Sequence, residues 1–372
     1  MTHSQRRDRL RAQLATRGLD ALLVTDLVNV RYLSGFTGSN GALLVFADDF
    51  SDRSPVLATD GRYRTQAAEQ APDLEVAIER VLGRYLAGQA AEAGARKLGF
   101  ESNVVTVDGF DALTSELEGR KAATELVKAA GTVEGLREVK DAGEVALLRL
   151  ACEAADAALT DLVARGGLRP GRTEREVSRE LEALMLDRGA DAISFETIVA
   201  AGPHSAIPHH RPTDAALAAG DFVKIDFGAL VGGYHSDMTR TFVLGKAAAW
   251  QLEIYQLVAD AQRAGREALC AGADLRGVDT AARQVIADAG YGEQFGHSLG
   301  HGVGLEIHEA PGIGATSTGT LLAESVVTVE PGVYLPGRGG VRIEDTLVVP
   351  EKGRAQAPEL LTKFPKELTV LT

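Results

Sequence analysis

The sequence predicts two domains of different class, a small α/β domain followed by a larger α+β domain. With 372 residues, the chain is too long for one ordinary hydrophobic core and long enough for two. Short apolar runs alternate with helical patterns in the first part, whereas long amphipathic helices surround a glycine-centred hairpin in the second. We place the first domain at residues 1–130, a linker at residues 131–138 and the second domain at residues 139–372.

The first domain is expected to consist of short elements. A basic helix over Ser4–Arg17 ends at Gly18, and apolar runs at Ala21–Thr25 and Ala42–Phe46 predict strands on either side of a polar, glycine-punctuated loop. The expected elements that follow are a strand at Val56–Thr59, a helix at Arg62–Gln70 that stops before Pro72, and strands at Leu98–Phe100 and Val104–Val107. This alternation is typical of a small α/β domain.

The second domain is expected to pack helices on a curved antiparallel sheet. Asp141 and Glu144 form a capping-box pattern ahead of an amphipathic helix, whose apolar stripe includes Cys152. The other expected elements are a helix capped by Thr173 and Glu176, helices at Ala248–Cys270 and Leu275–Ala289, and strands at Val326–Glu330 and Val341–Val349. Helices on an antiparallel sheet make an α+β arrangement.

Composition excludes several classes of function. The chain is 45 % hydrophobic and 24 % charged with a net charge of −13, so we expect a soluble globular protein that does not bind nucleic acid. Neither a signal peptide nor an apolar run of the ~20 residues needed to cross a bilayer is present, so no membrane partner is expected. The two cysteines, Cys152 and Cys270, lie in helical patterns, which predicts buried reduced thiols and a cytoplasmic location.

The stretch Phe222–Phe242 reads as a hairpin that carries a candidate metal site. Strand-forming flanks surround the Gly232–Gly233 pair. A turn centred just before Gly232 would place Asp226 directly opposite Asp237, with Cβ atoms ~5 Å apart. Facing carboxylates repel unless a cation lies between them, so the pair indicates a metal site. Two solvated aspartates on an edge hairpin are the alternative interpretation.

The remaining candidate ligands come from later motifs. Seven of the eight histidines fall between positions 204 and 308, and His301 lies among glycines that leave room for an ion. Glu330 ends one apolar strand and Glu344 lies within another, where a charged side chain is costly unless it is paired or binds a metal. The candidate ligand set is Asp226, Asp237, His301, Glu330 and Glu344.

Five ligands with an excess of carboxylates suit a pair of divalent ions, with Asp237 and Glu344 as bridges. Oxygen-rich ligands favour Mn²⁺, and Co²⁺ and Zn²⁺ stay open as alternatives. Two ions ~3.5–4 Å apart activate a water molecule and polarise a carbonyl, so the set predicts metal-assisted hydrolysis.

At this point the sequence resembles a known family. The segments IDFGA, GYHSDMTRTF, HSLGHGVGLEIHEAP, TVEPGVYLPG and GVRIEDT are similar to the pita-bread-fold metallopeptidases, in particular the branch of Xaa-Pro aminopeptidases and Xaa-Pro dipeptidases. Residues 139–372 resemble the catalytic domain of that family. Residues 1–130 resemble its creatinase-type N-terminal domain, through RYLSGFTGSNG and DGRY.

The resemblance implies a role for each candidate site residue. The five ligands match a dinuclear metal centre, with Glu330 also moving a proton during the reaction. By the same resemblance, His297 and His308 contact the substrate and stabilise the tetrahedral intermediate, and Arg342 lies beside the last ligand. His209 matches a third catalytic histidine. However, His210 stands where relatives usually have glycine, so the choice between His209 and His210 stays open.

The activity that the resemblance implies is hydrolysis of the bond before proline, with a peptide that has proline at its second position as substrate. We expect an Xaa-Pro aminopeptidase, with an Xaa-Pro dipeptidase as the alternative, and Arg338 is a candidate to bind a dipeptide carboxylate. The resemblance also implies a homodimer. Creatinase-like or methionine aminopeptidase-like chemistry is possible on the same fold, although the two-domain length argues against the latter.

Two other interpretations are less consistent with the sequence. Gly296–Gly300 matches the G-x-S-x-G pattern of serine hydrolases, which requires a strand before the serine and a helix after it. Further glycines follow within a few residues, so no helix is expected there. A metal-free binding module on the same fold would lack ligands, and none of the five is missing.

Overall fold

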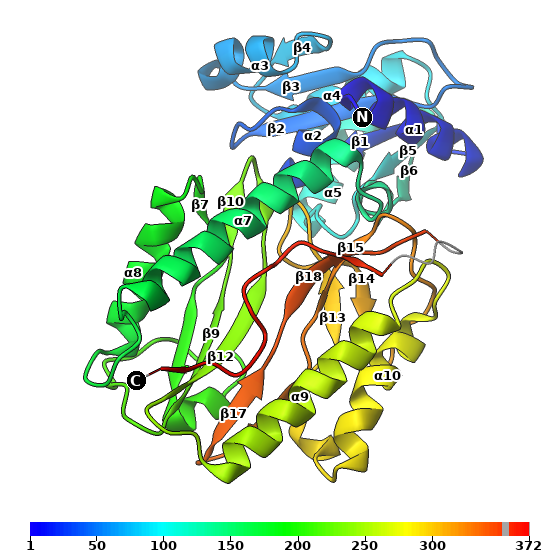
Figure 1. Ribbon diagram of the computed structural model, residues 1–372. Helices are drawn as coiled ribbons and strands as arrows, with labels where there is room; N and C mark the ends of the chain where they lie inside the picture. The colour runs from blue at the N-terminus through cyan, green and yellow to red at the C-terminus, as the bar shows by residue number, and fades with distance from the viewer. Residues whose placement is uncertain (352–356, 372) are drawn as a thin grey trace. The chain divides into compact units, whose positions relative to one another are not determined.

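The computed structural model describes residues 1–351 and 357–371. By its internal contacts the chain divides into two compact units, Met1–Arg137 and Glu138–Thr372 (Figure 1). The stretch expected to be a linker contains a short helix, α6 (Glu134–Arg137), at the end of the first unit.

A six-stranded mixed sheet forms the centre of the first unit. Its strand order is β4-β3-β2-β1-β5-β6, with antiparallel β1–β2 and β2–β3 pairs and parallel β3–β4, β1–β5 and β5–β6 pairs. The strands are β1 (Ala21–Val24), β2 (Gly41–Phe46), β3 (Val56–Thr59), β4 (Glu75–Ile78), β5 (Lys97–Phe100) and β6 (Glu125–Lys128). The other helices are α1 (His3–Thr16), α2 (Leu27–Ser34), η1 (Gly61–Tyr63), α3 (Arg64–Gln70), α4 (Leu82–Glu92) and α5 (Val107–Gly119).

Two elements of this unit differ from the prediction, because side chains that cap helix N-termini begin helices at places where a loop and a strand were expected. Part of the expected loop after β1 is helix α2, whose N-cap Asp26 accepts hydrogen bonds from two backbone N–H groups and whose C-cap Gly35 has a φ of 79°. The strand expected at Val104–Val107 is absent from the described chain. Thr106 instead caps helix α5 by accepting a hydrogen bond from Gly109 N.

The second unit contains two pairs of long helices and several small sheets. The helices are α7 (Ala142–Ala164), α8 (Glu174–Asp187), η2 (Gly202–Ala206), α9 (Ala249–Glu267), α10 (Leu275–Asp288) and η3 (Gly292–Gln294). The strands are β7 (Ala192–Ile193), β8 (Ile198–Ala201), β9 (Phe222–Phe227), β10 (Ala229–Val231), β11 (Tyr234–His235), β12 (Met238–Leu244), β13 (Gly300–Gly302), β14 (Glu309–Ile313), β15 (Val326–Val329), β16 (Gly332–Leu335), β17 (Gly339–Arg342), β18 (Asp345–Val348), β19 (Glu359–Leu360) and β20 (Val370–Leu371).

The pairing in this unit is antiparallel, as predicted, except that β20 runs parallel to β12. The larger sheets have the orders β20-β12-β9-β8 and β14-β13-β15-β18-β19, and the smaller ones β11-β10-β7 and β16-β17. Both predicted capping boxes are present, at Asp141 with Glu144 and at Thr173 with Glu176. The strand predicted at Val341–Val349 is broken into β17 and β18, and Glu344 lies in the break.

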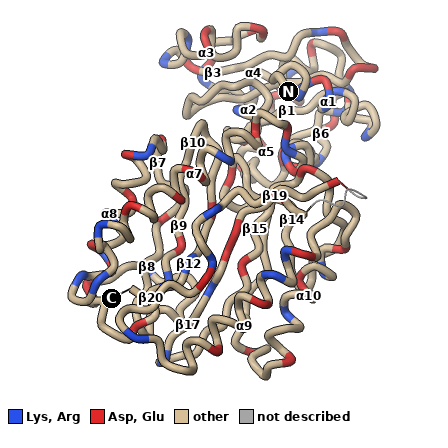
Figure 2. The backbone as a smooth tube through the Cα atoms, viewed as in Figure 1, with Lys and Arg blue, Asp and Glu red and all other residues tan. Residues whose placement is uncertain are grey.

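Two hydrophobic cores hold the strands between the helix pairs (Figure 1). Helices α7 and α8 pack with β8, β9 and β12 in one core, and α9 and α10 pack with β15, β16, β17 and β18 in the other. Figure 2 shows that charged residues also occur on the strands β9 and β12. No helix of the described chain is both long enough and apolar enough to span a bilayer.

The two thiols lie in different environments. Cys152 is fully buried in α7, and burial raises the pKa of its thiol well above the usual value. Cys270 is exposed, so the prediction of a buried thiol is wrong there. Helix α9 ends at Glu267, and Cys270 lies in the turn that follows rather than on the helix face that was expected to bury it.

We therefore expect a single fast-reacting thiol per folded chain. With an aromatic disulfide reagent, Cys270 should react in the native protein, and Cys152 should react only after denaturation, because the thiolate is the reactive form. The Cys270→Ser variant is the control and should be unreactive when folded. Two fast thiols in the native wild type, or none, would contradict this assignment.

Candidate metal centre

The hairpin that carries the two aspartates has a different register from the predicted one. Gly232 and Gly233 both have positive φ, 57° and 83°, so they form the two-residue turn themselves. As a consequence, Asp226 pairs with Thr239, and the prediction that it directly faces Asp237 is wrong. A shift of two positions preserves the face of the strand, because side chains alternate with a period of two. Both aspartates therefore line the same cavity.

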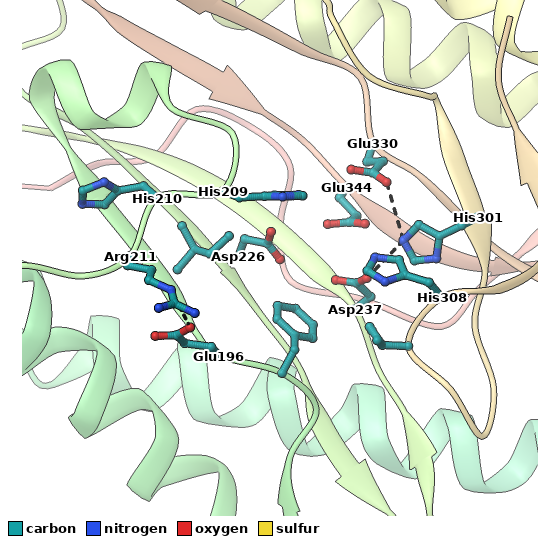
Figure 3. A pocket seen from close by; sticks show the side chains of 13 residues that line it. Glu196, His209, His210, Arg211, Asp226, Asp237, His301, His308, Glu330 and Glu344 are labelled. Carbon is teal, nitrogen blue, oxygen red and sulfur yellow. Dashed lines mark ion pairs between the residues drawn. The ribbon is translucent and has the colours of Figure 1, made fainter. Parts of the chain in front are cut away.

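Most of the predicted ligands lie where strands are interrupted. Asp237 precedes β12, Glu330 follows β15, and Glu344 lies between β17 and β18. Backbone hydrogen bonds tie two of these breaks to neighbouring segments, from Glu344 N to Thr239 O in β12 at 3.2 Å and from Glu330 N to Leu299 O, just before β13, at 2.8 Å. The interruptions turn the chain so that side chains from separate sheets point toward one centre, as Figure 3 shows.

All five predicted ligands line one cavity of about 300 Å³ (Figure 3). His301 Nε2 lies 3.5 Å from Asp237 Oδ2 and 3.6 Å from Glu330 Oε1. One ligand atom each of Asp237, His301 and Glu344 lies within 4.8 Å of the other two. Asp226 reaches the cavity from β9, and its Oδ2 accepts a short hydrogen bond from Arg342.

The cluster carries more buried carboxylates than it has cations to neutralise them. Burial first, and the neighbouring Glu344 carboxylate second, raise the pKa of both Asp237 and Glu330 well above the usual range. Burial and the nearby Asp226 raise the pKa of Glu344 to about 8. Burial and the shortage of nearby positive charge therefore disfavour simultaneous ionisation of these three carboxyl groups.

The residues fit bound divalent ions. Asp226 lines the cavity, and its Oδ1 is buried and has no hydrogen-bond partner among the described residues, which leaves an acceptor available to a metal ion. Burial lowers the pKa of His301 to about 4, so its imidazole is neutral near pH 7 and can act as a ligand. Carboxylate oxygens with one imidazole nitrogen suit Mn²⁺ and related ions.

The other predicted histidines lie around this centre. The rings of His308 and His301 are in edge contact, with centroids 4.3 Å apart. His297 Nε2 lies 2.8 Å from the Tyr334 hydroxyl group, and that oxygen accepts a 2.8 Å hydrogen bond from Arg342 Nη1. Burial lowers the pKa of His297 to about 4 and also lowers the pKa of His308, so both rings are neutral near pH 7.

His209 and His210 have opposite orientations, although both contribute to the cavity lining. In Figure 3 the His209 ring points toward Asp226 and Glu344, whereas the His210 ring points away from them. His210 is buried, and its Nε2 lies 2.9 Å from Glu174 Oε2. The geometry therefore favours His209 as the residue that meets a substrate.

Sequence reasoning missed three residues near the centre. Tyr334 contacts both Arg342 and His297, Lys224 is fully buried beside Asp226 on β9, and Glu174 binds His210. A lysine inside an apolar strand was a visible signal for Lys224. Arg338 was expected near the site, but its guanidinium lies over the Trp250 ring at 4.2 Å and does not line the cavity.

A buried cluster of carboxylates and a histidine at the meeting point of antiparallel strands defines a metal-dependent hydrolase as the class of protein. Ser298 cannot form a nucleophile elbow, because strand β13 follows it where a helix is required.

Comparison with protein families identifies the chain more closely. The model of metallopeptidase family M24 matches residues 146–351, and the creatinase/prolidase N-terminal domain matches residues 6–139. The chain belongs to metallopeptidase family M24. The predicted recognition of a pita-bread metallopeptidase with a creatinase-type N-terminal domain is thus confirmed, and the protein is a metallo-exopeptidase.

Individual relatives cover nearly the whole chain. A solved structure of an Xaa-Pro dipeptidase from Bacillus anthracis is 40 % identical with a TM-score of 0.91 and covers 100 % of both chains. An Xaa-Pro dipeptidase from Pyrococcus horikoshii is 36 % identical over 94 % of each chain. The structure of an X-Pro aminopeptidase from Thermotoga maritima is 34 % identical, covers 98 % of this chain and 99 % of that one, and has a TM-score of 0.87.

The raised carboxyl pKa values predict how the stability of the metal-free protein changes with pH. A carboxyl group with a raised pKa in the folded state stabilises the fold below its ordinary pKa, and this contribution is lost as pH rises through the folded value. Glu344, with a folded pKa of about 8, together with Asp237 and Glu330, should make the free energy of unfolding fall between pH 6.5 and 8.5. His297, His301 and His308, with lowered pKa values, oppose this fall only weakly above pH 6.5, because histidines of the unfolded chain are then at most about half protonated.

Urea denaturation of the chelator-treated protein measures this dependence. Glu344→Gln should flatten the fall, since it removes one titrating group without changing the shape of the site. With saturating Mn²⁺ the free energy of unfolding should instead rise with pH over this range, because metal binding requires ionised ligands. A metal-free stability that is constant or that rises from pH 6.5 to 8.5 would contradict the proposed charge balance.

Proposed function

We propose that the protein hydrolyses Xaa-Pro dipeptides at the bond before proline, as an Xaa-Pro dipeptidase. The observation that carries this proposal is the small acidic cavity of about 300 Å³, at the lower end of the range for small-molecule sites. Relatives named as Xaa-Pro dipeptidases, similar over 94 % or more of the chain, support it. The aminopeptidase that the sequence favoured becomes the second candidate.

The proposed ligands of two divalent ions, most favourably Mn²⁺ with Co²⁺ or Zn²⁺ as alternatives, are Asp226, Asp237, His301, Glu330 and Glu344. A pair of ions bound there supplies an activated water molecule and polarises the scissile carbonyl. Asp237 and Glu344 are the proposed bridging ligands, and this proposal is consistent with the pKa of Asp237, which is raised first by burial and then by the neighbouring Glu344 carboxylate.

The remaining groups act on the substrate itself. We assign to His308 and His209, which line the cavity, the donation of an N–H to the oxygen that becomes negative in the tetrahedral intermediate. The role proposed for ionised Glu330 is to accept a proton from the attacking water and deliver it to the proline nitrogen. That nitrogen belongs to a tertiary amide without an N–H, so it needs a proton in order to leave. His297 and Arg342 support this side of the site through Tyr334.

The cavity lining suits a short peptide with a free amine. The acidic floor attracts an ammonium group, and Phe195, Ile198 and Ile307 provide apolar walls. Arg211 is the non-histidine cation among the lining residues of the described chain, and it pairs with Glu196 at 3.1 Å. Both side chains are exposed, by 83 % and 61 %, so this ion pair is easily exchanged for a substrate carboxylate.

The alternative, an Xaa-Pro aminopeptidase, is favoured by the similarity to the Thermotoga maritima structure with that name. Such an enzyme must leave space for the peptide beyond proline, whereas a dipeptidase must bind the proline carboxylate. The expected homodimer and cytoplasmic location remain predictions.

Substrate length separates the two candidates. We expect Ala-Pro to be hydrolysed with a kcat/KM at least about tenfold higher than Ala-Pro-Ala or a pentapeptide with the same first two residues, because the longer chains place no carboxylate beside proline. The rate of hydrolysis is measured by chromatography of the free alanine or proline that is released. Chelator-treated enzyme is the control. Equal or better cleavage of the pentapeptide would establish the aminopeptidase instead.

Replacing a bridging ligand should affect both ions. Asp237→Asn is expected to reduce bound metal from two equivalents to nearly none, because a neutral amide cannot bridge two cations. Asp226→Asn, which alters a ligand of one ion, should lose about one equivalent. Elemental analysis after dialysis counts the ions, and circular dichroism checks the fold. Two retained equivalents in Asp237→Asn would disprove the bridging role.

A further inference from the structure

The segment 202–213, here called the His209 loop, begins with η2 after strand β8 and carries His209 into the cavity. Within the described chain, the His209 ring has no hydrogen-bond partner, so side-chain bonds do not fix its position. The backbone on either side of it must therefore determine where the ring lies. Two buried ionisable side chains, one basic and one acidic, contact that backbone and its neighbouring side chains.

Lys224 contacts the loop from the sheet. It lies on β9 between β8 and β12 and is fully buried. Its ammonium group donates to Ile207 O at 2.6 Å and to Pro208 O at 3.1 Å, and it lies 5.1 Å from the centre of the Tyr334 ring. A buried ammonium is costly unless polar partners replace water. The two carbonyls immediately before His209 therefore have strongly preferred positions.

Glu174 contacts the loop from the first residue of helix α8. Its Oε1 accepts from Ala201 N at 2.9 Å and lies 2.9 Å from His204 Nδ1. Its Oε2 lies 2.9 Å from His210 Nε2 and accepts from Thr213 N at 3.0 Å and Thr213 Oγ1 at 2.7 Å. A helix N-terminus also favours a negative charge. The carboxylate is fully buried and both of its oxygens are occupied.

A metal ion is the alternative explanation of this second cluster, because ligand atoms of Glu174, His204 and His210 lie within 4.8 Å of one another. The hydrogen bonds argue against it. Each carboxylate oxygen already has two or more partners from the His209 loop or the strand before it, so little acceptor capacity is left for a cation.

We propose that Lys224 and Glu174 are positioning residues that clamp the His209 loop from two sides and thereby hold the His209 side chain in the catalytic cavity. Lys224 fixes the carbonyls that precede His209, and Glu174 fixes the side chains of His204, His210 and Thr213 around it. His210 then serves as an anchor, which accounts for two adjacent histidines with opposite orientations. This inference deepens the proposed peptidase function and rests on it for the kinetic test only.

A double-mutant cycle tests whether the clamp acts through His209. Lys224→Met and Glu174→Gln keep approximate side-chain size, and each should lower kcat about tenfold or more while KM for Ala-Pro changes less than about twofold. In a His209→Ala background the same substitutions should change kcat by less than about twofold, because the group that they position is gone. Equal factors in both backgrounds would overturn the proposal.

Val223→Ala is the matched control. Val223 neighbours Lys224 on β9, but its side chain points to the opposite face of the strand and packs in the core with α7 and α8. The substitution should lower thermal stability and leave kcat within about twofold of the wild type. If it lowered kcat as much as Lys224→Met does, general destabilisation would explain the kinetics and the clamp would be refuted.

A second measurement needs no activity and no metal. In histidine-labelled, metal-free protein, the ring signal that disappears in His209→Ala identifies His209. Lys224→Met and Glu174→Gln should each shift or broaden that signal. Val223→Ala should leave it unchanged, and the signal of His3, in the first unit, should be unchanged in all three variants. An unmoved His209 signal in both variants would overturn the proposal, and Glu174→Asp replaces Glu174→Gln if the latter does not fold.

The outcomes separate this inference from the proposed function. If wild-type protein fails to hydrolyse any Xaa-Pro peptide, the proposed function is wrong, and the ring signals still decide whether the clamp exists. Glu174→Gln should also retain the wild-type number of bound Mn²⁺ ions. Loss of one equivalent in that variant would show that Glu174 is a metal ligand and would overturn its role as an anchor.

Discussion

The main physical constraint on the second unit is a cluster of buried carboxylates that repel one another. Asp226, Asp237, Glu330 and Glu344 converge from separate strands, and their repulsion and burial raise the pKa of three of them. Such a cluster is costly in a folded protein unless cations neutralise it. Divalent ions bound at this site would relieve the repulsion between the carboxylates. Metal binding would therefore increase the free energy of unfolding as well as supply the chemistry of the site.

Buried cations around the centre hold the polypeptide that carries these carboxylates. Arg240, on β12, donates to Glu344 O at 2.5 Å and to Asp345 Oδ1 at 2.8 Å, and Lys366 lies 2.8 Å from Asp345 Oδ2. Burial by itself would raise the pKa of Asp345, but Arg240 and Lys366 outweigh it and hold the pKa below its usual value. The ionised Asp345 thus fixes the backbone beside Glu344 and ties it to the C-terminal segment.

The cavity combines rigid and exchangeable interactions. The candidate ligands, Arg342 and Tyr334 are held by buried strands and hydrogen bonds, whereas Arg211 and Glu196 form an exposed pair at the same cavity. Buried, hydrogen-bonded groups keep their positions during a reaction, which is the requirement for stabilising a transition state. Exposed groups can change partners at little cost, which is the requirement for admitting different substrates.

Residue patterns by themselves predicted the two-domain arrangement, the capped helices α7 and α8 and a turn at Gly232 and Gly233, because these depend on local spacing. Charges in apolar strands also pointed to the five candidate ligands, which the structure brings to one cavity, and their role as ligands stays a prediction. The predictions were wrong where a single residue sets the position of a turn or the start of a helix. The turn includes both Gly232 and Gly233, so the predicted pairing of the aspartates was wrong by two positions, and Asp26 caps a helix that was read as a loop.

The sequence determined which chemical groups are present, and only the tertiary structure decided which of them meet. Spacing along the chain could not show that Lys224 and Glu174 contact the loop that carries His209, since those contacts join segments up to 39 residues apart. It also could not separate His209 from His210, because the two side chains differ only in which long-range partner each one faces. Long-range packing fixes such orientations, and no local pattern encodes them.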